Sequence, residues 1–226
     1  MTDTMDDTDA ELDVSSPRGN TLTRVLIGLV VLAVAAAAVA VDYQWGHGTN
    51  RAAPSTASVD AGFARDMTIH HQQAVTMANY VRDNSTDPAL RILAYDIETE
   101  QLFQIGQMQG WIDDWGVPRQ VPTTMAWMAG HAHVQANGLM PGMASPTEMN
   151  TLQTLHGKAL DIMFLQLMIR HHQGGIPMAQ YAAQHASKDY VRLLAQSMVT
   201  AQSGEIVTME QMLRELGSAP LPPPEI

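Results

Sequence analysis

The stretch FARDMTIHHQQAVTMANY at residues 63–80 is matched by a second one, FLQLMIRHHQGGIPMAQY at residues 164–181. The two copies lie 101 residues apart, and the register holds without a gap as far as Met108 and Met209. Agreement of this length indicates a duplicated structural unit rather than a shared composition. The repeated residues include a pair of adjacent histidines and two methionines in each copy.

The spacing of the apolar residues in the first copy predicts a helix. Phe63, Met67, His70, Ala74 and Met77 follow steps of three or four residues, which place them on one helical face. The same reasoning predicts four long helices, at about residues 59–82, 88–115, 161–186 and 190–216. Two helix pairs related by duplication predict an all-α fold, a four-helix bundle.

Local signals set the expected helix ends. Asp87 before Pro88 is a helix N-cap followed by proline at the first helical position, and Gly116 stops the same helix. Residues 145–148, Ser-Pro-Thr-Glu, form a capping box, so helical structure should resume there. Pro177 removes a backbone hydrogen bond inside the third long helix, which predicts a kink near residues 174–175.

Composition excludes several classes of function. The formal net charge is −11 with only 12 Lys and Arg, which argues against a nucleic-acid partner. Cysteine is absent, which removes disulfides, thiolate metal sites and cysteine nucleophiles. Methionine reaches 16 residues while aromatic residues make up 5% of the chain, so methionine fills positions that other proteins give to leucine or phenylalanine.

An apolar segment near the N-terminus predicts export. Residues 25–41 carry no charge and span roughly 26 Å as a helix, close to the thickness of a bilayer core. We expect a single transmembrane anchor at residues 22–43, with the N-terminus in the cytoplasm and the helical domain outside the cell membrane. The alternative is a secreted protein, released by cleavage of a signal peptide near Ala40.

The chain therefore divides into five parts by composition and periodicity. The predicted parts are an acidic cytoplasmic tail at 1–21, the anchor at 22–43, a linker at 44–58, the duplicated helical domain at 59–217 and a proline-rich tail at 218–226. Within the domain, the repeats cover about 59–116 and 160–217. A Met- and His-rich connection at 117–144 separates them.

The repeated histidines and methionines are the candidate metal ligands. Thioethers prefer Cu(I), whereas imidazole accepts Cu(I), Cu(II) and Zn(II). Met67 lies one helical turn from His70 and His71, so one helix face can offer both donor types to an ion. The candidate ligands are His70, His71, His171, His172, Met67, Met168, Met77 and Met178.

Other interpretations of these residues stay open. Each of the four methionines also sits where a core residue belongs, and the methionines of the connection suit either copper capture or packing over the bundle end. The paired histidines also suit a purely structural or partner-binding bundle, with hydrogen-bonding or pH-sensing roles. A di-iron enzyme would require Glu-x-x-His on two helices, and this motif occurs nowhere in the sequence, so no enzymatic activity is expected.

The chain resembles the domain-of-unknown-function 305 family over most of residues 59–217. The resemblance rests on the doubled motif, on Pro141-Gly142-Met143 before the capped helix, and on the pattern Glu205-Ile206-x2-Met209. It implies a ferritin-like helical bundle, an exported or anchored protein, and copper binding. The first repeat departs from the pattern, because Gln104 stands where the second repeat has Glu205.

Together these observations predict an extracytoplasmic, membrane-anchored protein that binds metal ions without turnover. Copper is the expected ion, with Cu(I) favoured and Zn(II) left open. A homo-oligomer or a partner that delivers metal is compatible with the sequence.

Overall fold

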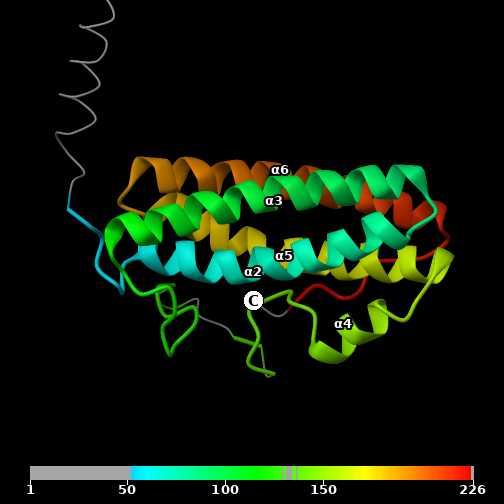
Figure 1. Ribbon diagram of the computed structural model, residues 1–226, viewed down its shortest axis with the longest axis horizontal. Coiled ribbons are helices and arrows are strands. Elements are labelled where there is room, and N and C mark those ends of the chain that lie inside the picture. The colour runs from blue at the N-terminus through cyan, green and yellow to red at the C-terminus, as the bar shows by residue number, and fades with distance from the viewer. Residues whose placement is uncertain (1–51, 129, 131–133, 136, 225–226) are drawn as a thin grey trace, which may run out of the picture. The chain divides into compact units, whose positions relative to one another are not determined.

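The computed structural model describes residues 52–128, 130, 134–135 and 137–224, and in these ranges it is helical and contains no strand. The predicted all-α fold is confirmed. Four long helices lie side by side, with one short helix beneath them (Figure 1). The long helices are α2 (Val59–Asn84), α3 (Pro88–Trp115), α5 (Gly157–His185) and α6 (Asp189–Glu215), and the short one is α4 (Pro146–Leu152).

The predicted anchor at residues 22–43 lies outside the described residues. Among the helices that are described, none is both long and apolar enough to cross a bilayer.

Most helix ends fall where the local sequence places them. Asp87 accepts hydrogen bonds from the backbone N–H groups of Ala89 and Leu90, and Gly116 ends α3 in the left-handed conformation with φ 64°. The capping box at residues 145–148 is formed in full, with both reciprocal bonds between Ser145 and Glu148. Asp87 and Ser145 are therefore true N-caps.

Helix α5 differs from the prediction at its start. It begins at Gly157 rather than Asp161, because Leu160 extends the buried stripe one turn before Phe164 and is itself fully buried. Helix α2 continues to Asn84, two residues past its predicted end at residue 82. The helix α5 also runs without a break through Pro177.

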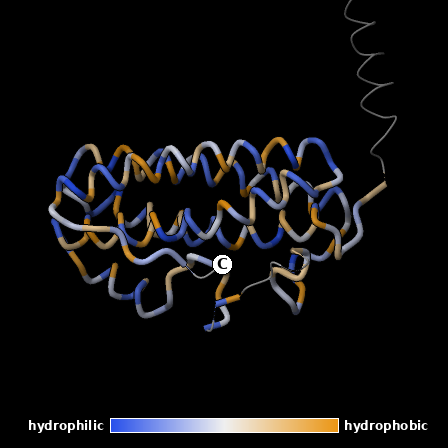
Figure 2. Tube along the Cα trace, turned by 180° about the vertical axis from the view of Figure 1, so that it is seen from behind, coloured by the Kyte–Doolittle hydropathy of each residue, from blue (hydrophilic) through white to orange (hydrophobic). Residues whose placement is uncertain are grey.

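Each repeat forms one antiparallel helix pair. Helix α2 packs on α3, α5 packs on α6, and the two pairs meet mainly through α2 and α5. These are the helices that carry the duplicated stripe, whose first copy is buried over its whole length from Phe63 to Val81. Figure 2 shows apolar and polar segments alternating along each helix, as expected for helices with one buried face.

Two aspartates at equivalent positions of the repeats each bind the turn between the two helices of the other repeat. Asp60 of α2 accepts hydrogen bonds from the backbone N–H and hydroxyl of Ser187 and from the backbone N–H of Lys188, at 2.8–3.1 Å. Asp161 of α5 accepts a hydrogen bond of 2.7 Å from the hydroxyl of Ser85. The duplication therefore builds a reciprocal contact, with more bonds on the Asp60 side.

The apolar core consists of two clusters. Among the described residues, the loop-side cluster contains 19 that are buried, including Phe63, Met67, Ile112, Trp115, Met178 and Ala195. The α4-side cluster contains 17, including Met77, Leu90, Leu152, Phe164, Met168 and Leu213. On α2 the buried apolar side chains stop at Met67 and resume at Ala74, and on α5 they stop at Ile169 and resume at Met178. Polar residues fill the interval between the two clusters.

The unequal aspartate contacts lead to a first prediction. Asp60→Ala should lower the free energy of unfolding by about 2–3 kcal/mol, because it leaves donors of the turn at Ser187 without an acceptor. Asp161→Ala removes a single bond and should cost about 1 kcal/mol. Urea unfolding followed by circular dichroism measures both. An equal loss in the two variants would contradict the asymmetry.

A candidate metal centre in a buried polar layer

A layer of polar side chains crosses the middle of the bundle between the two apolar clusters. All four long helices contribute to it, and seven of its members are at most 5% exposed. The four histidines have no exposed surface at all. The polar layer consists of His70, His71, Gln101, Gln104, His171, His172, Gln202 and Glu205.

Each histidine of the polar layer holds an oxygen atom with its Nε2. His71 bonds to Oε1 of Gln104, and His172 bonds to a carboxylate oxygen of Glu205, both at 2.6 Å. These two pairs are related by the duplication, so Gln104 does in the first repeat what Glu205 does in the second. The other two histidines, called the inner pair here, bond to backbone carbonyls. His70 donates to the carbonyl oxygen of Pro141 at 3.0 Å, and His171 donates to the carbonyl oxygen of His70 at 3.1 Å.

These partners fix the tautomer of the imidazole rings. A carbonyl oxygen can only accept, so Nε2 carries the hydrogen in His70 and His171. The amide of Gln104 is oriented too, because its Nε2 donates to Glu100 at 2.8 Å and its oxygen is left for His71. In a neutral ring with Nε2 protonated, Nδ1 carries a free lone pair. The Nδ1 atoms of all four histidines are buried and have no hydrogen-bond partner among the described residues.

Burial also keeps the rings of His70, His71 and His171 neutral. It lowers the pKa of His70 to about 4, and burial with the neighbouring charge of His70 lowers the pKa of His71 to about 3. Burial likewise holds the pKa of His171 well below its usual range. At neutral pH these side chains are therefore lone-pair donors rather than cations.

The loop before α4 closes the polar layer from one side. The side-chain amide of Gln73 in α2 makes two hydrogen bonds with the backbone of Ala144. It accepts from the N–H at 2.7 Å and donates to the carbonyl oxygen at 2.9 Å. The equivalent position in α5 is Gly174, where an added Cβ would lie 2.0 Å from the carbonyl oxygen of Pro141. Gly142, with φ 78°, makes a similarly close approach to the backbone of Arg170. The glycines therefore let the loop reach the carbonyl position that His70 uses.

The histidine rings differ in how they meet. The rings of His70 and His171 are 3.8 Å apart between centroids and inclined by 38°, whereas those of His171 and His172 are 6.3 Å apart. Within the described part of the chain, no group of three or more His, Cys, Asp or Glu side chains is arranged to hold a metal ion. The layer thus supplies donors but not a preformed site of three such ligands.

The four predicted methionine ligands are fully buried in the apolar clusters beside the polar layer. Met67 and Met178 belong to the loop-side cluster, and Met77 and Met168 belong to the α4-side cluster. The structure therefore brings the four histidines together in one layer and divides the methionines between its two sides.

Sequence reasoning did not identify several members of the layer. Gln101 and Gln202 are equivalent positions of the repeat, are each 3% exposed and have side-chain atoms without partners among the described residues. Their identity in both copies was a usable signal. The carbonyl of Pro141 carried no such signal, because a backbone acceptor can be assigned only from the fold.

Comparison with known proteins places these observations in a family. The sequence profile of the domain of unknown function DUF305 matches residues 60–213. The chain belongs to the DUF305 family. Among proteins with curated descriptions, none matches this chain.

Solved structures of DUF305 proteins share the fold. A candidate secreted DUF305 protein from Streptomyces coelicolor is 43% identical, with a TM-score of 0.69 over 74% of this chain and 99% of that one. A DUF305 fragment from Deinococcus radiodurans is 34% identical, with a TM-score of 0.58 over 70% and 96%. CopM in its Cu(II)-bound form is 28% identical, with a TM-score of 0.57 over 70% and 97%.

The neutral buried histidines predict a loss of stability in acid. Unfolding restores the ordinary histidine pKa near 6.5, so below that pH the unfolded chain of the metal-free protein binds more protons than the folded one. Stability should fall as the pH drops from about 6.5 towards 4, by up to about 1.4 kcal/mol per pH unit for each of His70, His71 and His171. Urea unfolding at a series of pH values measures this slope.

Two matched variants show which histidine causes the change of stability with pH. His71→Gln should reduce it by about 1.4 kcal/mol per pH unit, because its folded pKa of about 3 leaves His71 neutral across the window. His156→Gln, at an exposed position, should leave the slope unchanged. An identical slope in wild type and His71→Gln would show that His71 is not held neutral by burial.

Proposed function

We propose that this DUF305 protein binds copper in its polar layer, as a non-catalytic, extracytoplasmic metal-binding protein. One observation carries the proposal: four buried histidines each hold an oxygen through Nε2 and leave Nδ1 without a partner among the described residues. Histidines that ligate metals show this arrangement, because the second ring nitrogen is oriented by a carbonyl or carboxylate.

The chemistry of the layer suits a cation of the borderline to soft class. Neutral imidazole nitrogens are good ligands for Cu(I), Cu(II) and Zn(II), and the methionine sulfurs on either side favour Cu(I). A buried Nδ1 atom without a hydrogen-bond partner costs about 1–3 kcal/mol of folding free energy. A cation or water molecules in the layer would remove that cost. His70 and His171 would hold the ion with a nitrogen each, and Gln104 and Glu205 would orient His71 and His172.

The structural relatives support copper as the ion. CopM has been solved in forms bound to Cu(II), Cu(I) and silver, and in an apo form. The chain is 25–28% identical to these structures. A shared fold at this identity supports a related metal preference here, and the imidazole nitrogens of this chain gather in the polar layer.

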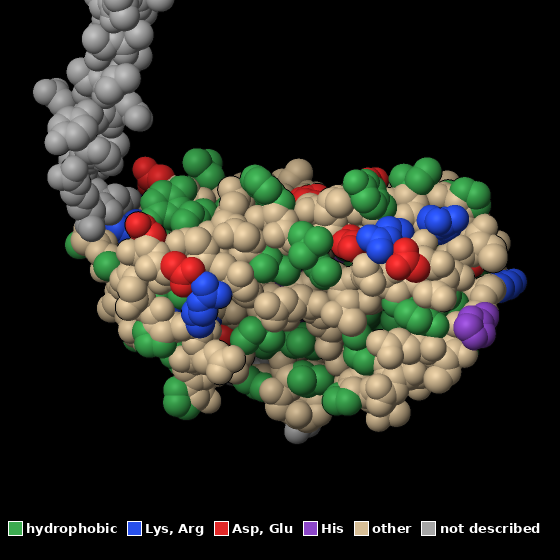
Figure 3. Space-filling view, in the orientation of Figure 1, with side chains coloured by type: hydrophobic (Ala, Val, Ile, Leu, Met, Phe, Trp, Pro, Cys, Tyr) green, Lys and Arg blue, Asp and Glu red, His purple; other side chains and the backbone are tan. Residues whose placement is uncertain are grey.

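A structural bundle is the second candidate, and one observation favours it. The rings of His70 and His171 lie 3.8 Å apart between centroids in a tilted contact, which an ion between them would have to change. In this alternative the layer fixes the register of the four helices, as buried polar residues do in some helical assemblies. Hydrophobic side chains scattered over the surface would then offer contacts to a partner (Figure 3).

An enzymatic role is not part of the proposal. Glu205 is bonded to His172, and Glu98 is paired with Arg82 at another level of the bundle. Carboxylates that are already paired do not resemble the four-glutamate set of a ferritin-like di-iron centre. We therefore propose storage or tolerance of copper, in a ferritin-like bundle, without turnover.

Copper binding leads to a direct test. Replacing the four histidines of the polar layer with glutamine keeps a donor for each oxygen and removes the imidazoles. Anaerobic Cu(I) competition titration should show tight binding by the wild-type protein and a loss of at least about 100-fold in affinity in this variant. Zn(II) and Fe(II) titrations run alongside establish the selectivity.

The matched control replaces the exposed histidines His156 and His185 with glutamine, and it should bind copper as the wild type does. Circular dichroism checks that both variants keep their helix content. Unchanged copper affinity in the four-histidine variant would reject the layer as the copper site. No copper binding by the folded wild type would favour the structural bundle.

The location outside the cytoplasm is a separate proposal. It rests on the apolar segment at residues 22–43 and on the relative from Streptomyces coelicolor described as a candidate secreted protein. Alkaline phosphatase fused after Ile226 should be active, since that enzyme needs disulfides formed outside the cytoplasm. Deleting residues 22–43 should abolish this activity. Fractionation then separates an anchored protein from one released by cleavage near Ala40, and activity only of a cytoplasmic reporter would contradict the topology.

A further inference from the structure

The two apolar clusters have different compositions although the duplication relates them. Eight of the 19 buried residues in the loop-side cluster are methionines, against three of 17 in the α4-side cluster. Six of the 17 buried residues in the α4-side cluster are leucine, whereas the buried members of the loop-side cluster in the described ranges include none. The eight methionines are Met67, Met108, Met125, Met128, Met140, Met143, Met178 and Met198.

The excess comes from the loop rather than from the helices. The helical methionines of the two clusters nearly match through the repeat, as Met67 pairs with Met168 and Met108 with Met209. The other four belong to the connection between the repeats, whose described part runs beside α2 in Figure 1. They are between 1% and 8% exposed. Packing alone does not require sulfur at these positions, since leucine of similar volume fills the other cluster.

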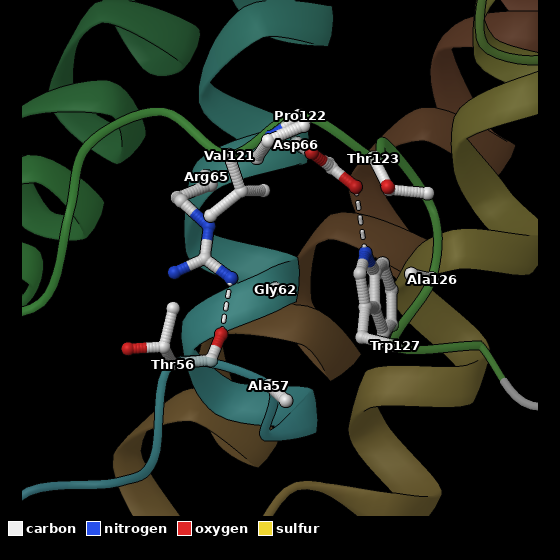
Figure 4. A pocket seen from close by; sticks show the side chains of 10 residues that line it. All are labelled: Thr56, Ala57, Gly62, Arg65, Asp66, Val121, Pro122, Thr123, Ala126 and Trp127. Atoms are coloured by element: carbon white, nitrogen blue, oxygen red, sulfur yellow. Dashed lines mark hydrogen bonds between the residues drawn. The ribbon is translucent and has the colours of Figure 1, made fainter.

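The backbone holds one of these methionines in an unfavourable conformation. Met125 has φ 64°, and no other non-glycine residue in the described ranges has a positive φ. The buried carboxylate of Asp66 accepts the backbone N–H of Met125 at 2.6 Å and the indole N–H of Trp127 at 2.8 Å, the latter shown in Figure 4. Strain kept in place by such specific contacts is typical of functional sites.

Trp127 fixes the same segment against the first helix. An added Cβ on Gly62 would lie 2.3 Å from the indole ring, so the glycine lets the ring rest directly on the α2 backbone. The ring is also packed edge-on against Phe63 and Tyr181. Asp66 and Gly62 therefore act together to anchor residues 125–128 with both methionines turned into the core.

We propose that the loop methionines Met125, Met128, Met140 and Met143 form, with methionines of the bundle, a thioether site for a soft monovalent cation such as Cu(I) or Ag(I). Thioethers are neutral and polarisable, so they bind such ions without adding charge to an apolar core. The site lies in the loop-side cluster, and it does not depend on metal binding by the histidines of the polar layer.

Met143 brings the loop-side cluster to the surface of the molecule. Met143 is the most exposed of the four at 8%, and it lines a surface hollow of about 650 Å³ together with Gln135, Asn137 and Glu148. Among the four loop methionines, Met143 is therefore the one most accessible to an ion from solvent. Glu148 is already paired with Arg170 and adds no free charge to the entrance.

Ag(I) titration of the full-length protein labelled with 13C at the methionine methyl groups tests the proposal. Ag(I) is diamagnetic and needs no reductant, and single Met→Leu variants assign the signals. We expect the methyl signals of Met125, Met128, Met140 and Met143 to shift with the first equivalents of Ag(I). Replacing all four with leucine, which conserves volume, should weaken Ag(I) binding at least about tenfold.

The matched control replaces four methionines of the α4-side cluster and its margin, Met149, Met163, Met209 and Met212, with leucine, and it should bind Ag(I) as the wild type does. Shifts confined to methionines outside the loop, or equal losses in the two variants, would overturn the proposal. If the loop variant loses helix content, Met128→Leu and Met143→Leu replace it. The four-histidine variant separates the two proposals, because it removes the imidazoles of the layer and should leave the loop signals shifting.

Discussion

The burial of four imidazoles in the middle of the bundle is the constraint on which the rest of the structure depends. Each ring must place its Nε2–H on an oxygen, because an unpaired buried donor costs about 1–3 kcal/mol. For His71 and His172, the outer pair, the accepting oxygen belongs to a side chain on α3 or α6. For the inner pair it belongs to a backbone carbonyl. The carbonyl of Pro141 serves only if the loop lies against α5, and Gly174 and Gly142 make that approach sterically feasible.

This requirement also explains why two repeats related by duplication give an asymmetric molecule. The outer pairs obey the duplication, since His71 with Gln104 corresponds to His172 with Glu205. The inner pair breaks it: the one connecting loop supplies its carbonyl to His70, and His171 uses the carbonyl of His70 instead. The substitution of Gln73 by Gly174 between the copies follows from this, as one helix holds the loop with a side chain and the other admits its backbone.

The sequence was sufficient for the features that depend on periodicity and local chemistry. The stripe from Phe63 to Val81, the caps at Asp87 and Ser145 and the stop at Gly116 are all present in the structure. The polar layer as a unit was not predictable, because the match of Gln101 with Gln202 marks an equivalent position but does not show that the assembled helices bury it beside the histidines. The start of α5 was placed one turn late, since Leu160 shows its role only through the cluster that it joins.

The separation of nitrogen and sulfur donors is the feature with the most chemical meaning. The sequence places Met67 one turn from His70, which suggests a mixed site, yet the fold assigns the sulfur to an apolar cluster and the imidazole to the polar layer. Imidazole accepts copper in either oxidation state, whereas thioether strongly prefers Cu(I). A bundle with imidazoles at its centre and methionines concentrated on one side therefore offers two environments of different softness. Because the loop contributes to both, through Pro141 to the layer and through Met140 and Met143 to the cluster, the packing of one segment couples them.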